Sequence, residues 1–417
     1  MNNNLGNIAK ELIRIIRETV HICHPERIMP ALIQEKHFKQ TLGLFALGKS
    51  AISMAEAFLN HTPVKPEFSL ALTSPLYKPN TFNKEITFLY GDHPYPGKST
   101  VESSRYALNK LIHDISPSGE IVLLISGGGS SLFEIPESPY TIEQISSLTK
   151  DLMLKGADIY ELNTVRKYLS AVKGGKLASR LYPRSIVAFI MSDVMGDNPE
   201  FIASGPVSPD STTTDSVRNI LKKYNIAYHF LHDNTTNAPK HNYEHVTSYI
   251  VFNNNTLLNA CENILKHKGR PVIKLPYSLE GEARQCGKKI AGSIVSSINS
   301  IKEPFFILTG GECSVTVKGT GKGGRNLELV LGTALELAKY HFRWIVTSIG
   351  SDGIDGPTDT AGGWLSSESF DYNNISIAEK ALKNNDTYPF FEQLETLIKT
   401  GYTGINLNDL FLAYIEP

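Results

Sequence analysis

Three apolar runs of strand length are each followed by small or polar residues and then by a helical pattern. LGLFAL runs into Gly48-Lys49-Ser50, IVLLIS runs into Gly127 to Ser130, and SIVAFIM runs into Ser192-Asp193. Strand, glycine-rich or polar turn and helix form the repeating order of a parallel α/β sheet. Ligands of such sheets bind at the carboxyl ends of the strands. The pattern therefore predicts an α/β fold whose site residues follow the strands.

A polar tract separates this series from a second one. HDNTTNAPKHN (232–242) has the composition of a domain connection or an exposed loop, and beyond it come SYIVFNN, LLNACENILKHKG, RPVIKLP and RWIVTSIG. A chain of 417 residues exceeds what one hydrophobic core usually supports. We expect two α/β domains with mainly parallel sheets, a Rossmann-like domain over residues 1–235 and a second domain over residues 236–417.

Composition excludes several classes of function. The formal net charge is -1 and 20% of the residues are charged, so nothing favours binding to nucleic acid or to a membrane surface. The four cysteines lie far apart without a CxxC motif, which favours free thiols in a reducing cytoplasm. The first twenty residues form an amphipathic helical pattern with both charge signs, unlike a secretion signal or a membrane span.

The loops after the first two runs favour an anionic ligand. Gly43 to Ser50 matches GxxxxGK[ST], but the four residues between the glycines are apolar and belong to a strand, so we reject a P-loop. Lys49 remains as a cation at a strand-to-helix junction, and a solvated lysine is the alternative. Ser126, Gly127, Gly128, Gly129 and Ser130 offer bare backbone N–H groups and hydroxyls. A plain tight turn is the alternative here.

A helical segment follows in which Asn163, Arg166, Ser170 and Lys173 recur at helical spacing. This spacing predicts one polar helix face, and the glycine pair that follows makes a pocket wall more credible than a solvated surface.

Two acidic loops follow later strands. Asp193 and Asp197 lie four apart in a loop with Gly196, and acids in such a loop can hold Mg²⁺ through one or two oxygens plus water. Asx turns would explain the same residues. Gly350 to Asp359 combines three acids with three glycines, and Asp352 is its candidate for binding a metal or a hydroxyl.

The stretch FFILTGGECSVTVKGTGKGGRNLE (305–328) is the most informative part of the sequence, because several structural motifs and candidate site residues lie close together in it. We expect a strand that breaks at Gly310-Gly311, a second extended run over Cys313 to Val317, a loop rich in glycine and cations, and a helix from Asn326. Gly311 and Glu312 before the loop and Arg325 and Asn326 after it are candidates for contact with an anion. The alternative is a tight hairpin followed by a helix cap.

These motifs, in this order, resemble the glycerate 2-kinase family whose C-terminal part is the MOFRL domain. The matching segments extend over nearly the whole chain: GKSAISMA, GDHPYP, ISGGGSSL, NTVRKYLSAVKGGKLA, SDVMGDNPEFIASGPVSPD, TGGECSVTVKGTGKGGRNLELVL, SIGSDGIDGPTDTAGGW and TGYTGINLNDL. Small departures are Tyr168, Ser351 and the YTGIN segment. His93 in GDHPYP is expected to have a structural role.

The resemblance implies two α/β domains with the active site in the cleft between them. It implies ATP-dependent phosphorylation of D-glycerate at its 2-hydroxyl, with Mg²⁺. A cytoplasmic location and a homo-oligomeric state are further expectations. Lys49, Asp193 and Arg325 are then the expected catalytic residues. The expected nucleotide contacts are Ser126 to Ser130, Asn163, Arg166, Lys173, Gly311, Glu312, Asn326 and Asp352, and the expected metal ligands are Asp193 and Asp197.

An NAD(P)H-dependent hydroxypyruvate reductase is the alternative function. Against it, no GxGxxG motif follows a strand with an acidic residue about twenty positions further on. Nor does the sequence offer an obvious histidine–arginine pair for a 2-hydroxy acid.

Overall fold

The computed structural model describes residues 5–77, 83–227, 231 and 243–417, which group into two compact units. The middle unit contains residues 28–251, and the terminal unit contains residues 1–27 together with 252–417. The predicted boundary at 235/236 and the polar tract 232–242 lie outside the described residues. The described residues up to Arg27 group with the last part of the chain, because the helix Leu5–Ile22 packs against the helix Asn254–Lys266.

The middle unit is built on a six-stranded sheet with the order β3-β2-β1-β4-β5-β6. Neighbouring strands from β3 to β5 pair in parallel. The strands are β1 (Leu42–Leu47), β2 (Phe68–Thr73), β3 (Thr87–Tyr90), β4 (Glu120–Ile125), β5 (Ser185–Met191) and β6 (Val246–Phe252). This order is that of doubly wound sheets, in which the direction of winding reverses between the first and fourth strands. The three predicted apolar runs are confirmed as β1, β4 and β5.

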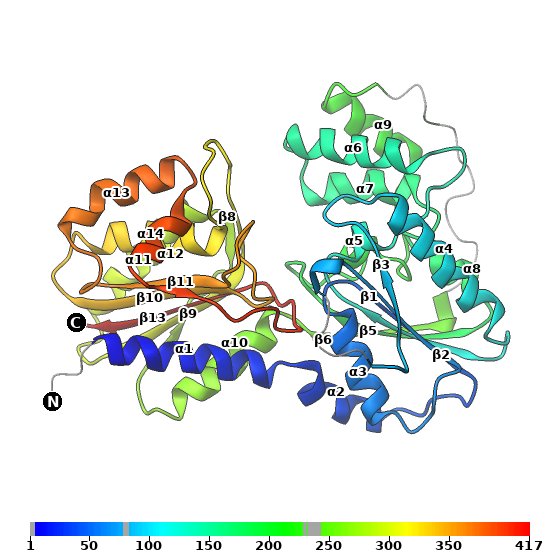
Figure 1. Cartoon of the computed structure of the whole chain (residues 1–417), viewed down its shortest axis with the longest axis horizontal. Helices are drawn as coiled ribbons and strands as arrows, with labels where there is room; N and C mark the ends of the chain where they lie inside the picture. Colours follow the sequence, from blue (N-terminus) through cyan, green and yellow to red (C-terminus); the bar gives the residue numbers. More distant parts are fainter. Residues whose placement is uncertain (1–4, 78–82, 228–230, 232–242) are drawn as a thin grey trace. The chain divides into compact units, whose positions relative to one another are not determined.

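Helices cover both faces of this sheet (Figure 1). The described helices are α2 (Pro25–Gln34), α3 (Ala51–His61), α4 (Lys98–His113), α5 (Gly129–Leu132), α6 (Ile142–Leu154), α7 (Ile159–Leu169), α8 (Lys176–Leu181) and α9 (Thr214–Lys223), with single 3₁₀ turns at Pro75–Tyr77, Ile202–Ser204 and Tyr243–His245. Every residue of β1 and β4 is buried, as expected for strands covered on both sides. Helices α6, α7 and α9 form a small apolar cluster of their own.

The terminal unit contains a seven-stranded sheet with the order β12-β11-β10-β13-β9-β7, and β8 also pairs with β9. Its strands are β7 (Val272–Lys274), β8 (Leu279–Glu282), β9 (Phe305–Ser314), β10 (Arg343–Gly350), β11 (Gly362–Ser366), β12 (Leu397–Ile398) and β13 (Asp409–Glu416). Only β7 and β8 run parallel to β9. The other pairings are antiparallel, and β13 inserts between β9 and β10. The α/β class holds, but the expectation of a mainly parallel sheet is wrong for this unit.

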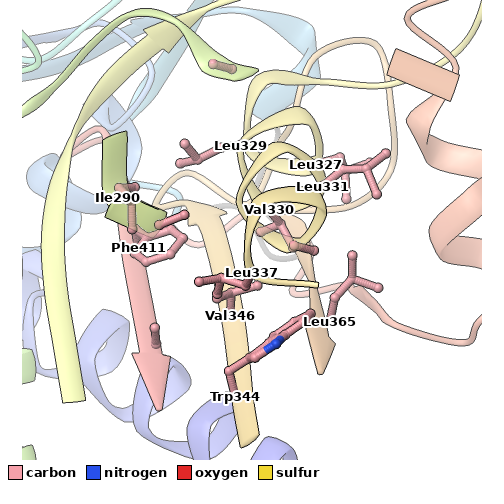
Figure 2. Close-up of a cluster of buried hydrophobic side chains, with 14 of the residues drawn as sticks. Ile290, Leu327, Leu329, Val330, Leu331, Leu337, Trp344, Val346, Leu365 and Phe411 are labelled. Atoms are coloured by element: carbon pink, nitrogen blue, oxygen red, sulfur yellow. The ribbon is translucent and has the colours of Figure 1, made fainter. Parts of the chain in front are cut away.

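Two layers of helices enclose this second sheet, as Figure 1 shows. One layer is α1 (Leu5–Ile22), the predicted amphipathic helix, packed on α10 (Asn254–Lys266). The other contains α11 (Ala283–Ile298), α12 (Arg325–Leu337), α13 (Tyr372–Lys383) and α14 (Thr387–Gln393). Figure 2 shows Leu327, Val330 and Leu337 of α12 lying against the strands beside Trp344, Val346, Leu365 and Phe411. This core fixes the start of α12, where several predicted site residues lie.

Candidate functional site

Loops at the carboxyl ends of β1 and β4 are hydrogen-bonded to each other where the strand order reverses. The N–H of Lys49 donates to the carbonyl of Gly127 at 2.8 Å, and the N–H of Ser50 donates to Oγ of Ser126 at 3.0 Å. Gly48 has a φ of 111°, and a Cβ there would lie 2.4 Å from the carbonyl oxygen of Ser126. Only glycine fits this approach, so the two predicted loops form one structure.

Lys49 and His93 both lie against the backbone of Gly128. This glycine has a φ of 80°, and a Cβ on it would lie 3.2 Å from Cγ of Lys49 and 3.3 Å from Nε2 of His93. His93 follows β3, so its loop lies at the same edge of the sheet. Asp92 holds that loop by accepting from the N–H of Thr100 and from Oγ of Ser99 at the start of α4. A lysine and a histidine thus converge on a glycine-rich turn.

Two hydroxyl groups, of which that of Ser204 is buried, join this turn to α7. Oγ of Ser204 lies 2.9 Å from Oγ of Ser130 and donates to Oδ1 of Asn163 at 2.8 Å. Ala203 and Ser204 have φ values of 51° and 59°, a left-handed conformation that non-glycine residues adopt at a cost of about 1 kcal/mol or more each. Nδ2 of Asn163 is buried and has no hydrogen-bond partner among the described residues.

Arg166 and Lys173 lie beside one buried carboxylate. Lys173 and Glu134 form an ion pair that is fully buried, and Lys173 also donates to the carbonyl of Phe133 at 3.0 Å. Arg166 is 9% exposed. Burial lowers the pKa of Arg166, opposed by the charge of Glu134. Burial likewise lowers the pKa of Lys173, opposed by its partner Glu134.

The predicted common helix face is wrong for Ser170 and Lys173. Helix α7 ends at Leu169, and Ser170 bridges to Pro136 in extended conformation. Nζ of Lys176 donates to the carbonyls of Lys167 and Ser170, which would otherwise lack partners among the described residues at the C-terminal end of α7. Lys173 reaches Glu134 from the turn that follows.

Asp193 and Asp197 occupy the loop after β5, which pairs with β4. Both are half-buried, and the N–H of Asp197 donates to the carbonyl of Val194 in a tight turn. Within the described ranges, no three His, Cys, Asp or Glu side chains gather as a metal cluster. Mg²⁺ commonly uses only one or two carboxylates together with phosphate oxygens and water, so the donor set of this loop suits it.

In the terminal unit, β9 continues through Gly310 and Gly311, where a break was expected. Both glycines pair with β13, and Gly311 also pairs with Leu279 of β8. A Cβ on Gly311 would lie 2.5 Å from the carbonyl of Leu279, and one on Gly310 would lie 2.4 Å from Oδ1 of Asn254. The glycines therefore let neighbouring strands approach on both sides, and the break expected at Gly310-Gly311 is wrong for this described stretch, as is the alternative of a tight hairpin.

Arg325 has carboxylate partners within its own unit. Its Nε and one terminal nitrogen donate to both oxygens of Asp409 at 2.7 and 2.9 Å. The other terminal nitrogen lies 2.8 Å from Oε1 of Glu312. The Asp409 side chain is 1% exposed, and the charges of both acids outweigh burial and raise the pKa of Arg325. The two N–H groups of Arg325 that could bind a ligand in a bidentate manner are already bound to Asp409.

Asn326 and Asp352 are enclosed at the start of α12. Asp355 accepts from the backbone N–H groups of Asn326 and Leu327 at 2.9 and 3.0 Å and so caps the helix. Oδ1 of Asn326 accepts from Oγ of Ser348. Asp352 is buried, and its Oδ1 accepts from the N–H of Ile354. These contacts place Asn326 and Asp352, two of the predicted site residues, close to the start of α12. Both side chains also help to hold the loop that follows β10.

The glycine-rich loop between Val317 and Gly324 lies on the segment 384–387. N–H groups of Lys318 and Gly319 donate to Oδ1 of Asn385, and that of Lys322 donates to Oδ1 of Asp386. Below the loop is a cavity of about 300 Å³, lined by Cys313, Ser314, Val315, Val317, Gly321, Gly323, Gly324, Arg325, Glu328, Gly356, Pro357 and Asn385. Much of this loop's backbone is thus satisfied by the protein itself.

The predicted residues therefore fall into two groups. Lys49, Ser126 to Ser130, Asn163, Arg166, Lys173, Asp193 and Asp197 belong to the middle unit, and Gly311, Glu312, Arg325, Asn326 and Asp352 belong to the terminal unit. Sequence reasoning missed Glu134, Ser204 and Asp409 and gave His93 a structural role. The position of His93 directly after a strand was the available signal, whereas nothing local marked Glu134.

Known proteins match the chain along its length. The profile described as Domain of unknown function (DUF4147) matches residues 11–236, and that of the MOFRL family matches residues 305–409. The "D-glycerate 2-kinase" of Thermotoga maritima is 34% identical over 98% of this chain and 99% of its own. The "Glycerate 2-kinase" of Picrophilus torridus is 33% identical over 99% of both chains.

The fold matches as well. A crystal structure of glycerate kinase from Thermotoga maritima superposes with a TM-score of 0.86 at 33% identity, covering 98% of this chain and 100% of that one. Matches of this length and identity, together with two family profiles in the expected order, show that the chain belongs to the glycerate 2-kinase family with a C-terminal MOFRL domain.

Proposed function

We propose that the protein is an ATP-dependent glycerate 2-kinase, which phosphorylates D-glycerate at its 2-hydroxyl and releases 2-phosphoglycerate and ADP. The observation that carries the proposal is the junction of the β1 and β4 loops, with Lys49 against the backbone of Gly128. Doubly wound sheets bind ligands where the strand order reverses, which is the position of this junction.

Phosphoryl transfer requires mainly positioning and positive charge around the transferred group. We assign phosphate binding to the turn from Ser126 to Ser130, whose bare backbone lets a phosphate approach closely. Lys49 neutralises charge on the transferred phosphoryl group. Asp193 and Asp197 would hold Mg²⁺, which neutralises phosphate charge when bound.

The transfer itself is a substitution at phosphorus. The 2-hydroxyl oxygen of glycerate forms a bond to the γ-phosphorus while the bond from that phosphorus to the bridging oxygen of ADP breaks. The hydroxyl proton passes to a carboxylate, and Asp193 is our candidate for this base as the alternative to its role as a Mg²⁺ ligand. The half-buried position of Asp193 after β5, beside the β4 loop, supports this choice.

We also propose roles for residues of the terminal unit. Gly311, Glu312, Asn326 and Asp352 are proposed to contact the nucleotide, and Arg325 to be the second catalytic cation. The occupied fork of Arg325 favours an indirect contribution, in which it orients Glu312. The cleft location of the active site, a cytoplasmic location and a homo-oligomeric state stay predictions. Within the described ranges, no helix is both long and apolar enough to cross a membrane.

One assay separates the kinase from the reductase. The protein is incubated with D-glycerate, ATP and Mg²⁺, ADP release is followed, and phosphorus NMR identifies the product. A parallel reaction contains hydroxypyruvate and NADH. We expect ADP and 2-phosphoglycerate. NADH oxidation without ADP release would overturn the proposal, and 3-phosphoglycerate as the sole product would overturn the assignment of the 2-hydroxyl.

Replacing Lys49 tests the role of the junction. We expect Lys49→Ala to lower turnover by about 10²–10³, the typical loss when one preorganised charge donor is removed. Lys65→Ala is the matched control, because Lys65 belongs to the same unit and is 86% exposed. A Lys49→Ala enzyme that keeps more than about a tenth of wild-type turnover would exclude the transition-state role.

A further inference from the structure

Arg166 is a buried cation to which no described residue forms a hydrogen bond. Helix α7 begins with a complete capping box formed by Asp158 and Glu161, so the helix that holds Arg166 is well defined. Along the described chain, no hydrogen bond or ion pair joins Arg166 to another side chain or to the backbone; Glu134 and Tyr95 influence it through their charges alone. A buried charge is costly unless it is paired, so this arrangement points to a partner from outside the chain.

The one carboxylate whose charge acts on Arg166 is already bound by another cation. Glu134 is bound by Lys173, and their charges cancel. Lys167, the next residue along the helix, lies 3.3 Å from Asp210 and is compensated there. Arg166 therefore has no carboxylate of its own among the described residues, and an anionic ligand would supply one.

A second, independent observation lies on the same face of α7. Asn163 stands three residues before Arg166, and its buried Nδ2 has no partner among the described residues. Its Oδ1 is fixed by Ser204, which is held in a left-handed conformation and lies beside Ser130 of the glycine-rich turn. Unpaired donors and backbone strain are retained where a ligand compensates for them.

We infer that Arg166 binds the carboxylate of the hydroxy-acid substrate, with Asn163 positioning the site beside the phosphate-binding turn. This inference rests on the proposed function and assigns its acceptor subsite. A carboxylate carries one negative charge and so matches one guanidinium, whereas the phosphates are already assigned to Lys49 and the turn from Ser126 to Ser130. The planar guanidinium also matches both oxygens of a carboxylate.

Kinetics of Arg166→Met test the assignment. Methionine keeps an unbranched side chain in the buried position but removes the charge. We expect the KM for D-glycerate to rise by about 10–100-fold, the range for losing hydrogen bonds to a charged group. The KM for ATP should change by less than about threefold, because the lost contact is not to the nucleotide. Discrimination between D-glycerate and glycerol, which lacks the carboxylate, should collapse by the same factor.

Thermal unfolding gives a readout that does not depend on turnover. We expect ligand-free Arg166→Met to melt at or above the wild-type temperature, because an unpaired buried charge has been removed. D-glycerate should raise the melting temperature of the wild type and of the exposed control Arg105→Met, but not that of Arg166→Met. ADP should stabilise all three.

The possible outcomes test the assignment of Arg166 and the proposed kinase reaction independently. Loss of the ADP response with retention of the glycerate response would overturn the inference in favour of a phosphate subsite. A drop of more than about 5 °C in ligand-free Arg166→Met, with equal changes in both KM values, would overturn it in favour of a structural role. If the wild type binds glycerate but shows no ATP-dependent turnover, the proposed function fails while the thermal data still decide the subsite.

Discussion

Two regions of this protein combine clustered glycines with a nearby cation, yet their structures differ. In the middle unit, the turn from Ser126 to Ser130 is hydrogen-bonded to the backbone of the β1 loop, and the side chains of Lys49 and His93 lie against Gly128. In the terminal unit, the loop before Arg325 donates its N–H groups to the segment 384–386, and Arg325 itself binds Asp409.

The difference shows what clustered glycines indicate. Glycine permits close approach of a backbone to some partner, but it does not specify whether that partner is a ligand or another segment of the chain. In the terminal unit, Cβ atoms on Gly319 and Gly321 would lie 2.1 and 2.3 Å from atoms of Asn384 and Asp386. We therefore expect variants in the first region to lower activity and variants in the second to lower stability.

The largest effect is expected for Arg325→Met. Removing Arg325 leaves the carboxylate of Asp409 buried and unpaired, which should cost about 2–4 kcal/mol of unfolding free energy, less than for a fully buried pair because Arg325 is 27% exposed. Urea unfolding measures this cost. The double variant Arg325→Met/Asp409→Leu should recover part of it. Loss of turnover with unchanged stability would instead favour a direct contact of Arg325 with the ligand.

Gly128→Ala should lower turnover by about tenfold, because Lys49 and His93 must each shift by a few tenths of an ångström to accommodate the added methyl group. Gly156→Ala is the matched control. Gly156 has nearly the same φ, 82° against 80°, but a Cβ on it would meet nothing within 4 Å. Both variants should lose a similar amount of stability from backbone strain. Equal turnover in the two variants would contradict the distinction between the regions.

Gly321→Ala should destabilise the terminal unit by about 1–3 kcal/mol, since its Cβ would lie 2.3 Å from Cβ of Asp386. Turnover per folded molecule should change by less than about threefold. Gly292→Ala in α11, where a Cβ meets nothing, should instead stabilise by about 0.5–1 kcal/mol. A loss of turnover in Gly321→Ala without a loss of stability would assign this loop to ligand binding after all.

The smallest effect concerns the pH dependence of stability. Burial raises the pKa of Asp355 to about 6, from an ordinary value of 3.8. The folded state therefore holds this proton more tightly than the unfolded state does, and stability falls as pH rises from 4 to 6. Relative to Asp355→Asn, the wild type should lose about 1–2 kcal/mol across this window, as one pKa unit corresponds to about 1.4 kcal/mol. Parallel stability curves for the two proteins would contradict the shift.

Local patterns predicted the elements well. The apolar runs became β1, β4, β5 and β10, and the helix expected from Asn326 begins at Arg325. Rejection of the P-loop is confirmed, because the residues between its two glycines form β1. Continuous apolar runs specify buried strands directly, since each residue must face a covered side of the sheet. The loops that follow these strands were predictable for the same reason.

Predictions failed where a distant segment supplies the partner. Pairing with β8 and β13 carries β9 through Gly310 and Gly311, and the ion pair with Asp409 occupies the fork of Arg325. Ser170 leaves the helical face because Pro136 pairs with it. None of these partners is near in sequence, so neither spacing nor composition could identify them.

The sequence by itself determined the α/β class, the position of the glycine-rich turn after β4 and the family of the protein. Those properties depend on local patterns and on the order of motifs along the chain. Tertiary structure alone decided that Arg325 is paired and that Arg166 is not, because a partner far away in the chain satisfies one buried charge and no described side chain satisfies the other. The sequence shows that an arginine is charged, but only the tertiary structure shows whether a carboxylate lies close enough to neutralise that charge.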